Sequence, residues 1–500
     1  MSNIKTILNQ SVKMTVYWIL SVSLGFVSNL IYTHYLTPEV FGNFTLSRTV
    51  VSFLPLISLF GLHKGLLRQG SIALGRDDVG LYTQIRNYTI SIAMIIGFSI
   101  GLITFVGANI IAVQFFKNAQ LAQQIRFFSF VIPAMVTSNM VMSLYQVNKK
   151  ASTGQFLYQV VYFSLLLGIF LIFTLFLKAE PLITWSFFIG HIIYFLLLLY
   201  YQGKLGYRFS LKIDKSEKKS IYKISFPQFL SAVFNQSQKW SDTILLGILG
   251  TSTQVGIYYI GLRIGGFISI PANAMNTIFM PIAARLIGQK KNAELNDLYK
   301  TVTRIIFVCG SLGFGIIFFL KTYLIDLFGK GYESSATIIL VLLISETIDF
   351  GVGPARQLIT MSGGGRINLI NSILTLTIDI TASFLLIPRY GIMGAAFANG
   401  LTNIVLQIVT VMELMFIYKL SPFNKEYFIE VGLFLFCFLG TVFLPLPDLV
   451  KLAIFLALLS TLYLTIVLGK NERAKIKNLL TQKRKKKKVR FEVDQVDQEV

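Results

Sequence analysis

Charged residues are scarce in this chain, and acidic residues are scarcer than basic ones. Asp, Glu, Lys and Arg make up 14% of the 500 residues, whereas soluble globular domains carry about a quarter. Hydrophobic residues make up 54%, and the mean hydropathy is +0.66. One chain cannot bury so much apolar surface in a core of its own. The composition therefore excludes an ordinary soluble protein and predicts that lipid is the solvent.

Cysteine and histidine are also sparse, with two and three residues. Cys309 and Cys437 lie in separate apolar runs, so the sequence offers neither a disulfide framework nor the spacing of a metal site. No nucleophile lies near a base in a recognisable pattern. The sequence therefore predicts that the protein is not an enzyme and holds no cofactor or metal.

Long apolar runs are abundant. A helix needs about 20 apolar residues to cross the hydrocarbon layer, and the sequence predicts an all-α polytopic membrane protein with about fourteen transmembrane helices by this measure. The first run is too long for the core of a signal peptide and is read as a retained helix. The expected spans are residues 14–36, 40–62, 85–108, 127–147, 155–177, 181–201, 224–249, 254–282, 303–325, 335–355, 367–387, 393–418, 427–446 and 449–468.

Most of the positive charge behind the net charge of +22 lies in the segments that are expected on one side of the membrane. If the N-terminus lies inside and the spans alternate, inside segments hold roughly five times as many Lys and Arg residues as outside segments. This asymmetry predicts that both termini are cytoplasmic. It also argues against a nucleic-acid partner, because the positive charge follows the loops.

Two segments repeat. "LTPEVFGNFTLSR" follows the first expected span and "LGTSTQVGIYYIGLR" follows the seventh. Gly42 matches Gly256 and Phe44 matches Tyr258, while Arg48 and Arg263 are one position out of register. A third echo, "YGIMGAAFAN", opens the twelfth span. Repeats of this kind are typical of transporters, in which similar lobes move around a central site.

The repeats predict two six-helix lobes related by a pseudo-two-fold axis. The expected domains are residues 1–215 (helices 1–6), 216–425 (helices 7–12), 426–470 (helices 13 and 14) and a cytoplasmic tail, 471–500. The tail is basic and then acidic, and we expect it to be disordered.

Several motifs carry a resemblance to a known family. "SDTILLGILGTSTQVGIYYIGLRI" and "LLIPRYGIMGAAFANGLTNI" resemble the oligosaccharide flippases of polysaccharide biosynthesis. These include the O-antigen and capsule repeat-unit flippases of the multidrug/oligosaccharidyl-lipid/polysaccharide exporter superfamily. The resemblance implies a flippase that moves an undecaprenyl-pyrophosphate-linked oligosaccharide from the inner to the outer leaflet by alternating access. It implies a bacterial cytoplasmic (inner) membrane, with glycosyltransferases and a polysaccharide polymerase as expected partners.

Arg48 and Arg263 are the first candidates for substrate binding. Each lies on the second helix of its expected lobe. A guanidinium group binds phosphate oxygens in pairs and keeps its charge when it leaves water, which suits a pyrophosphate. The alternative is that each arginine reaches to the membrane interface.

The segment "NQSQKWSD" is the most polar stretch within an expected span. Lys239 and Asp242 are three residues apart, so they share a helix face. They are read either as an internal ion pair or as part of a hydrated wall that binds sugar and phosphate. The further substrate-binding candidates in this segment are Asn235, Gln236, Gln238, Lys239 and Trp240.

Four acidic residues lie at membrane depth: Asp242, Glu346, Asp349 and Asp379. Such carboxyl groups can carry a proton or hold Na⁺, and either ion is a candidate for coupling. The alternative is local pairing, for example with Arg356 or Arg366. These acids are therefore read as ion-coupling or structural.

Two other functions stay open. A multidrug or organic-cation antiporter of the same fold needs acids in its cavity, and the first six spans have none clear of their ends. A non-transporting scaffold for polysaccharide assembly would use the basic loops to bind partners, but it gives the repeats and the midspan polar residues no role.

Overall fold

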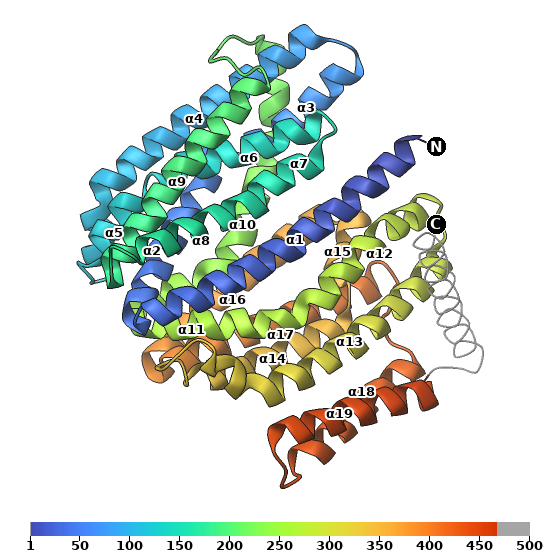
Figure 1. The fold of residues 1–500 in the computed structure, drawn as a ribbon. Coiled ribbons are helices and arrows are strands. Elements are labelled where there is room, and N and C mark those ends of the chain that lie inside the picture. The colour runs from blue at the N-terminus through green and yellow to red at the C-terminus, as the bar shows by residue number, and fades with distance from the viewer. Residues whose placement is uncertain (1, 468–500) are drawn as a thin grey trace, which may run out of the picture. The chain divides into compact units, whose positions relative to one another are not determined.

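The computed structural model describes residues 2–467, with the backbone alone for residues 2–9, 11 and 12. The described chain is helical and contains no strand (Figure 1), which confirms the predicted all-α class. The α-helices are α1 (Ser2–Tyr35), α2 (Pro38–Leu59), α3 (Leu62–Gly75), α4 (Val79–Ile110), α5 (Leu121–Phe128), α6 (Val131–Val147), α7 (Ala151–Gln155), α8 (Tyr162–Phe173), α9 (Ala179–Lys204), α10 (Lys215–Leu249), α11 (Ser252–Gly265), α12 (Ile270–Gly288), α13 (Asn292–Asp326), α14 (Ser335–Val352), α15 (Ala355–Met361), α16 (Gly365–Tyr390), α17 (Ile392–Phe416), α18 (Lys425–Val442) and α19 (Asp448–Leu462).

The number of spans differs from the prediction. Within residues 2–467, twelve helices are long and apolar enough to cross a membrane, whereas the sequence predicts fourteen. The two others expected to span, α10 and α18, are helical but too polar to qualify. The first contains the segment "NQSQKWSD", and the second contains Lys425, Glu426 and Glu430. A count of fourteen is therefore not confirmed.

The chain divides into two compact units. Unit 1 comprises residues 1–266, 321–345 and 364–409, and unit 2 comprises residues 267–320, 346–363 and 410–500. Each unit is described by itself. The division into lobes at residues 215 and 425 stays a prediction, and the tail at 471–500 lies outside the described residues.

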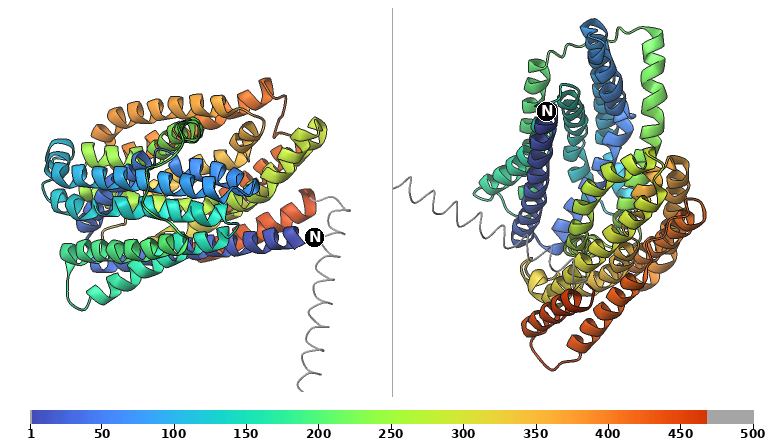
Figure 2. Two further views of the ribbon diagram at one scale, coloured as in Figure 1. Left: turned by 90° about the horizontal axis from the view of Figure 1, so that it is seen from above. Right: turned by 90° about the vertical axis from the view of Figure 1, so that its right-hand side faces the viewer.

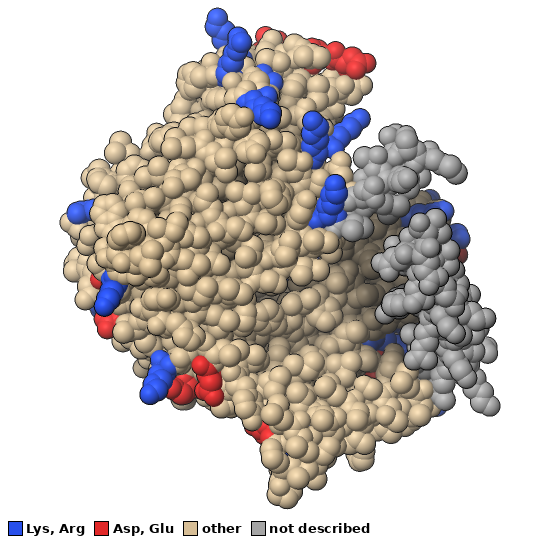
Figure 3. Space-filling model, in the orientation of Figure 1, with Lys and Arg blue, Asp and Glu red and all other residues tan. Residues whose placement is uncertain are grey.

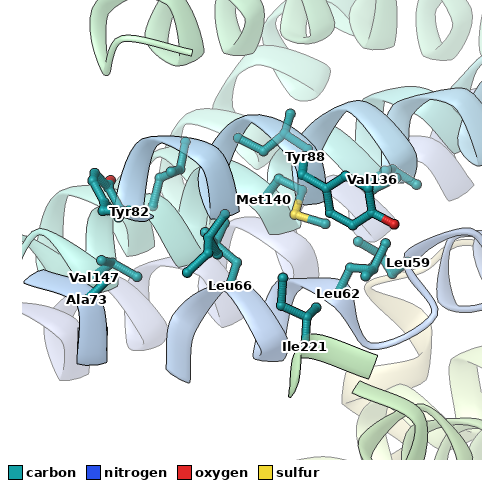
Figure 4. Packing of buried hydrophobic residues seen from close by; sticks show 14 residues of the cluster. Leu59, Leu62, Leu66, Ala73, Tyr82, Tyr88, Val136, Met140, Val147 and Ile221 are labelled. Carbon is teal, nitrogen blue, oxygen red and sulfur yellow. The ribbon is translucent and has the colours of Figure 1, made fainter. Parts of the chain in front are cut away.

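Part of the core of unit 1 lies between α3, α4 and α6 (Figure 4). Leu66 of α3, Ile85 of α4 and Met140 of α6 are fully buried there. Ile221, near the start of α10, completes the same cluster. The first turns of α10 thus belong to the bundle built by the helices before it.

Two matching helices cross tightly in unit 1. Helices α2 and α11 each begin after a threonine N-cap, Thr37 and Thr251, whose hydroxyl accepts a backbone N–H three residues on. A Cβ on Gly42 would lie 1.7 Å from the carbonyl oxygen of Ser252, and a Cβ on Gly256 would lie 2.5 Å from that of Pro38. Only glycine permits so close an approach.

The segment between α9 and α10 runs along α4. The Asn87 side-chain oxygen accepts the backbone N–H of Arg208 at 3.2 Å, and the Ser91 hydroxyl accepts that of Ser210 at 3.0 Å. Arg86 donates to the carbonyl oxygen of Leu205 at 3.1 Å. Because Asn87 and Ser91 are one turn apart, they satisfy successive backbone donors of an extended strap, residues 205–214. Helix α10 begins at Lys215, well before the start of the expected span at residue 224.

Unit 2 contains α12, α15, α18, α19 and most of α13. Aromatic rings join α13 to α18: Phe314 meets Phe434 at 5.4 Å and Phe438 at 5.0 Å between ring centroids. Arg304 of α13 donates to Glu430 of α18 at 2.8 Å, and the Glu430 side chain is only 1% exposed. This ion pair and the rings fasten α18 to α13.

The expected span at residues 254–282 is divided into two helices. Helix α11 ends at Gly265, a 3₁₀ turn covers Gly266–Ser269, and α12 begins at Ile270 with a proline in its first turn. Consecutive long helices of unit 1 run up and down (Figures 1 and 2). On the face of unit 1 in Figure 3, charged side chains gather near the helix ends and the surface between them is uncharged. Such a pattern is typical of a membrane protein.

Candidate functional site

Arg48 and Arg263 meet at one tyrosine. Both guanidinium groups donate a hydrogen bond to the hydroxyl oxygen of Tyr259. Both also lie over its ring, with the Arg48 Cζ 5.3 Å and the Arg263 Cζ 4.6 Å from the centroid. Cation–π contact and the shared acceptor hold two like charges together. The sequence predicts both arginines as site residues, and the structure places them side by side where α2 meets α11.

No carboxylate among the described residues forms an ion pair with Arg48 or Arg263. Arg48 is half-buried and turned toward Tyr259, while Arg263 is exposed. A guanidinium group has five N–H donors, so one bond to a tyrosine leaves most of them free for a ligand. We call Arg48, Tyr259 and Arg263 the arginine cluster.

The polar segment of α10 is exposed along one side. Ser231, Asn235 and Lys239 are four residues apart in sequence and all are exposed, so they line one face of the helix. No residue from Phe226 to Trp240 is buried, although Ser225 before them and Ser241 after them are. Of the remaining candidates, Gln236, Gln238 and Trp240 are half-buried, and Trp240 contacts Phe53 of α2 at 6.1 Å between ring centroids.

Lys239 and Asp242 do not form the ion pair that the sequence left open. Lys239 is exposed, whereas Asp242 is buried at 2% exposure. Asp242 Oδ2 instead accepts from the Tyr258 hydroxyl at 3.1 Å and from Asn399 Nδ2 at 2.6 Å. Although Lys239 and Asp242 are only three residues apart, the Lys239 side chain lies on an exposed surface and the Asp242 side chain lies in a buried site.

Asp379 of α16 joins Asp242 in a buried acid pair. It is also 2% exposed, its Oδ2 accepts from the Ser241 hydroxyl, and its carboxyl group lies within hydrogen-bonding reach of the Asp242 carboxyl group. The Oδ1 atoms of both residues are buried without any other partner. Two of the four predicted acids therefore form one site, which we call the acid pair.

The other two acids lie in unit 2. Glu346 and Asp349 are close enough to repel each other, and Asp349 attracts Arg356. The sequence anticipated this local pairing as the structural alternative.

Sequence reasoning missed the residues that organise both sites. Tyr258 and Tyr259 appeared only as letters of the repeat, and Asn399 only as the end of "YGIMGAAFAN". Their polar groups are neutral, so a search for charges within spans passed over them. The sequence did offer one signal. The segments that contain these residues are repeated motifs, and they lie close in sequence to the charged candidates.

Two curated proteins are similar to part of the chain. The "Capsular polysaccharide biosynthesis protein CapF" of Staphylococcus aureus is 27% identical over 225 residues, which are 44% of this chain and 54% of that protein. The "Probable low-salt glycan biosynthesis flippase Agl15" of Haloferax volcanii is 22% identical over 203 residues, 38% of this chain and 42% of that protein. The chain thus spans about half the length of the curated relatives it matches.

Solved structures share the fold over most of the chain. A structure titled "Lipid II flippase MurJ, inward closed conformation" superposes with a TM-score of 0.71 at 15% identity, covering 90% of this chain and 98% of that one. An inward-facing multidrug resistance MATE family transporter of the MOP superfamily gives 0.65 at 14% identity, covering 80% and 96%. Residues 9–287 match the family model described as polysaccharide biosynthesis protein. The chain, a multi-pass membrane protein, therefore belongs to the polysaccharide biosynthesis protein family.

Proposed function

We propose that this protein is a flippase, which moves a lipid-linked oligosaccharide with a diphosphate linkage across the membrane by alternating access. The observation that carries the proposal is the arginine cluster, in which two guanidinium groups share a neutral acceptor and have no carboxylate partner among the described residues. A permanent charge at membrane depth costs several kcal/mol unless it faces water or a partner. An anionic ligand would supply that partner.

The chemistry of the cluster fits a diphosphate. Arg48 and Arg263 are held close together by Tyr259, and each retains a planar fork that can bind two phosphate oxygens. A pyrophosphate offers two adjacent phosphoryl groups to two adjacent forks. Lysine would supply the charge without the paired geometry.

The exposed face of α10 fits the oligosaccharide. Asn235 and Lys239 lie on that face, and Trp240 lies beside it. Amide and ammonium groups hydrogen-bond to sugar hydroxyls, and the indole ring offers a flat apolar surface to a sugar ring. A polar helix face suits a hydrated passage better than it suits lipid.

The acid pair is the candidate site of a coupling cation, H⁺ or Na⁺. Two buried carboxylates within hydrogen-bonding reach repel each other, so a proton or a metal cation shared by the two groups would stabilise them. The transmembrane gradient of such a cation would supply energy for the movement of the substrate. No enzymatic step is part of this proposal.

The cellular setting belongs to the same proposal. We propose a bacterial cytoplasmic membrane with both termini in the cytoplasm, an undecaprenyl-pyrophosphate carrier, and glycosyltransferases and a polymerase as partners. The basic loop at Lys149 and the less basic turn at Lys117 test the orientation. A cysteine at residue 150 should react only with a membrane-permeant thiol reagent, and a cysteine at residue 118 also with an impermeant one.

Substitution of the cluster tests the function. Arg263→Ala and Arg48→Ala should abolish surface polysaccharide, and lipid-linked precursor should accumulate while the protein level stays normal. Arg389→Ala is the matched control, because Arg389 is exposed at the end of α16 in the same unit. Full polymer output from both cluster variants would refute the proposal and favour a scaffold.

A multidrug antiporter remains the second candidate, because the MATE fold also superposes on this chain. An organic cation would be repelled by the arginine cluster. In that case Arg263→Ala would leave the polysaccharide unchanged, and deletion of the protein would sensitise cells to cationic drugs.

A further inference from the structure

Two consecutive tyrosines of α11 connect the acid pair with the arginine cluster. The Tyr258 hydroxyl donates to Asp242 Oδ2 at 3.1 Å, and the Tyr259 hydroxyl accepts from Arg48 and Arg263. Tyr258 is fully buried and Tyr259 is 7% exposed. Successive side chains of a helix point about 100° apart, so one short stretch of α11 reaches both sites.

Apart from these tyrosines, the acid pair and the arginine cluster take their residues from different helices, with Arg263 of α11 as the exception. The acid pair receives Asp242 from α10, Asp379 from α16 and Asn399 from α17. Thr402 of α17 lies beside Asp379. Among the described residues that face the acid pair, Tyr258 is the only other titratable group. In the arginine cluster, α2 contributes Arg48 and crosses α11 closely at Gly42 and Gly256.

We propose that Tyr258 and Tyr259 couple the two sites, so that a cation at the acid pair strengthens the binding of a diphosphate at the arginine cluster. The inference rests on the proposed function for the identity of both ligands. Tyr258 and Tyr259 are positioning residues in this scheme. Neither has to touch the transported sugar.

Two physical effects act in the same direction. A cation shared by the two carboxyl groups cancels negative charge on the acid pair, which raises the electrostatic potential at the arginine cluster. It also weakens Asp242 Oδ2 as an acceptor, so Tyr258 is held less firmly. Because Tyr259 is the next residue of the same helix, its hydroxyl can then leave the guanidinium groups and free their donors for phosphate.

Because binding at the two sites would be thermodynamically linked, the affinity for one ligand should depend on the other. With the full chain in lipid nanodiscs, inorganic pyrophosphate should bind more tightly when Na⁺ replaces choline at constant ionic strength, or when the pH is lowered without Na⁺. Comparing the Na⁺ experiment with the low-pH experiment identifies whether the cation is Na⁺ or H⁺. Coupling between sites typically changes affinity by about 5- to 150-fold, and the effect must be reciprocal.

Two variants isolate the tyrosine link. Tyr258→Phe should still bind pyrophosphate, with an affinity that no longer depends on the cation. Asp242→Asn should bind it without added cation as tightly as the cation-saturated wild type. Tyr200→Phe is the matched control, because Tyr200 is exposed on α9, and it should keep the full cation dependence. Wild-type dependence in both Tyr258→Phe and Asp242→Asn would overturn the proposal.

A readout without pyrophosphate separates this inference from the proposed function. Hydrogen exchange of the backbone amides of residues 41–49 in α2 should change when the cation is added, and Tyr258→Phe should remove that change. If this holds while pyrophosphate fails to bind, the coupling stands and the anion site is refuted. If pyrophosphate binds and the wild type shows no cation effect in either assay, the coupling is refuted and the anion site stands.

Discussion

Gly42 of α2 and Gly256 of α11 occupy matching places in the repeat, and each faces the first turn of the other helix. Gly42 lies against Ser252 and Gly256 lies against Pro38. Ser252 lies four residues before Gly256, and Pro38 lies four residues before Gly42. Each glycine therefore contacts the equivalent position of the other helix. This reciprocity is what a two-fold relation between two copies of one motif requires.

A methyl group at this crossing should destabilise unit 1. Gly42→Ala would place a Cβ 1.7 Å from the Ser252 carbonyl oxygen, so the backbones must separate. Overpacking of this kind costs about 1–3 kcal/mol, which should lower the melting temperature in detergent. Gly107→Ala in α4 is the control, because a Cβ there meets nothing within 4 Å. Equal melting temperatures for the two variants would contradict the tight crossing.

Loss of the side chains that hold the strap should expose it to protease. In Asn87→Ala and Ser91→Ala, the backbone N–H groups of Arg208 and Ser210 lose their acceptors. Local opening then becomes easier, so trypsin should cut after Arg208 and Lys212 several-fold faster. Ser220→Ala is the control, since that hydroxyl donates only within α10. An unchanged cleavage rate would show that other contacts hold the strap.

The ion pair in unit 2 should matter more than its exposed counterpart. Glu430→Gln leaves the Arg304 guanidinium beside a neutral amide in a largely buried place, and breaking a buried pair typically costs about 3–5 kcal/mol. Glu294→Gln removes the exposed pair with Lys291, where about 0–1 kcal/mol is expected. Thermal unfolding of the two variants measures the difference. If Glu430→Gln is no less stable than Glu294→Gln, the buried pair does not fasten α18.

The exposed face of α10 should react with water-borne reagents. In a chain without Cys309 and Cys437, single cysteines at Ser231, Asn235 and Lys239 should label with a hydrophilic thiol reagent. Cysteines at Ser225 and Ser241, which are buried at either end of this stretch, should not. Mass spectrometry of the labelled protein measures the ratio, and uniform protection at all five positions would place this face in lipid or in a packed core.

Much of the fold is readable from the sequence because apolar length and polar turns determine helices locally. The matching motifs after the first and seventh spans identify α2 and α11 as counterparts, and their threonine caps and glycines confirm it. The extent of α10 was missed. The first turns of α10 are rich in lysine, a composition that is typical of a loop. They are nevertheless helical, and Ile221 and Ser225 bury one face of them against α3.

The candidate site was predictable only in part. Charge at membrane depth pointed to Arg48, Arg263, Asp242 and Asp379, because few such residues occur. Spacing along one helix suggested that Lys239 pairs with Asp242, but the partners of Asp242 come from α11, α16 and α17. Contacts between distant segments depend on how helices pack, and a single sequence does not show that.

Helix α10 contains buried residues toward both ends, whereas no residue from Phe226 to Trp240 is buried. Ile221 is packed with α3 and α4, Asp242 is tied to α11, α16 and α17, and Pro227 interrupts the backbone ladder between them. A bend at this proline would displace the exposed polar residues that follow it in α10, Ser231, Asn235 and Lys239.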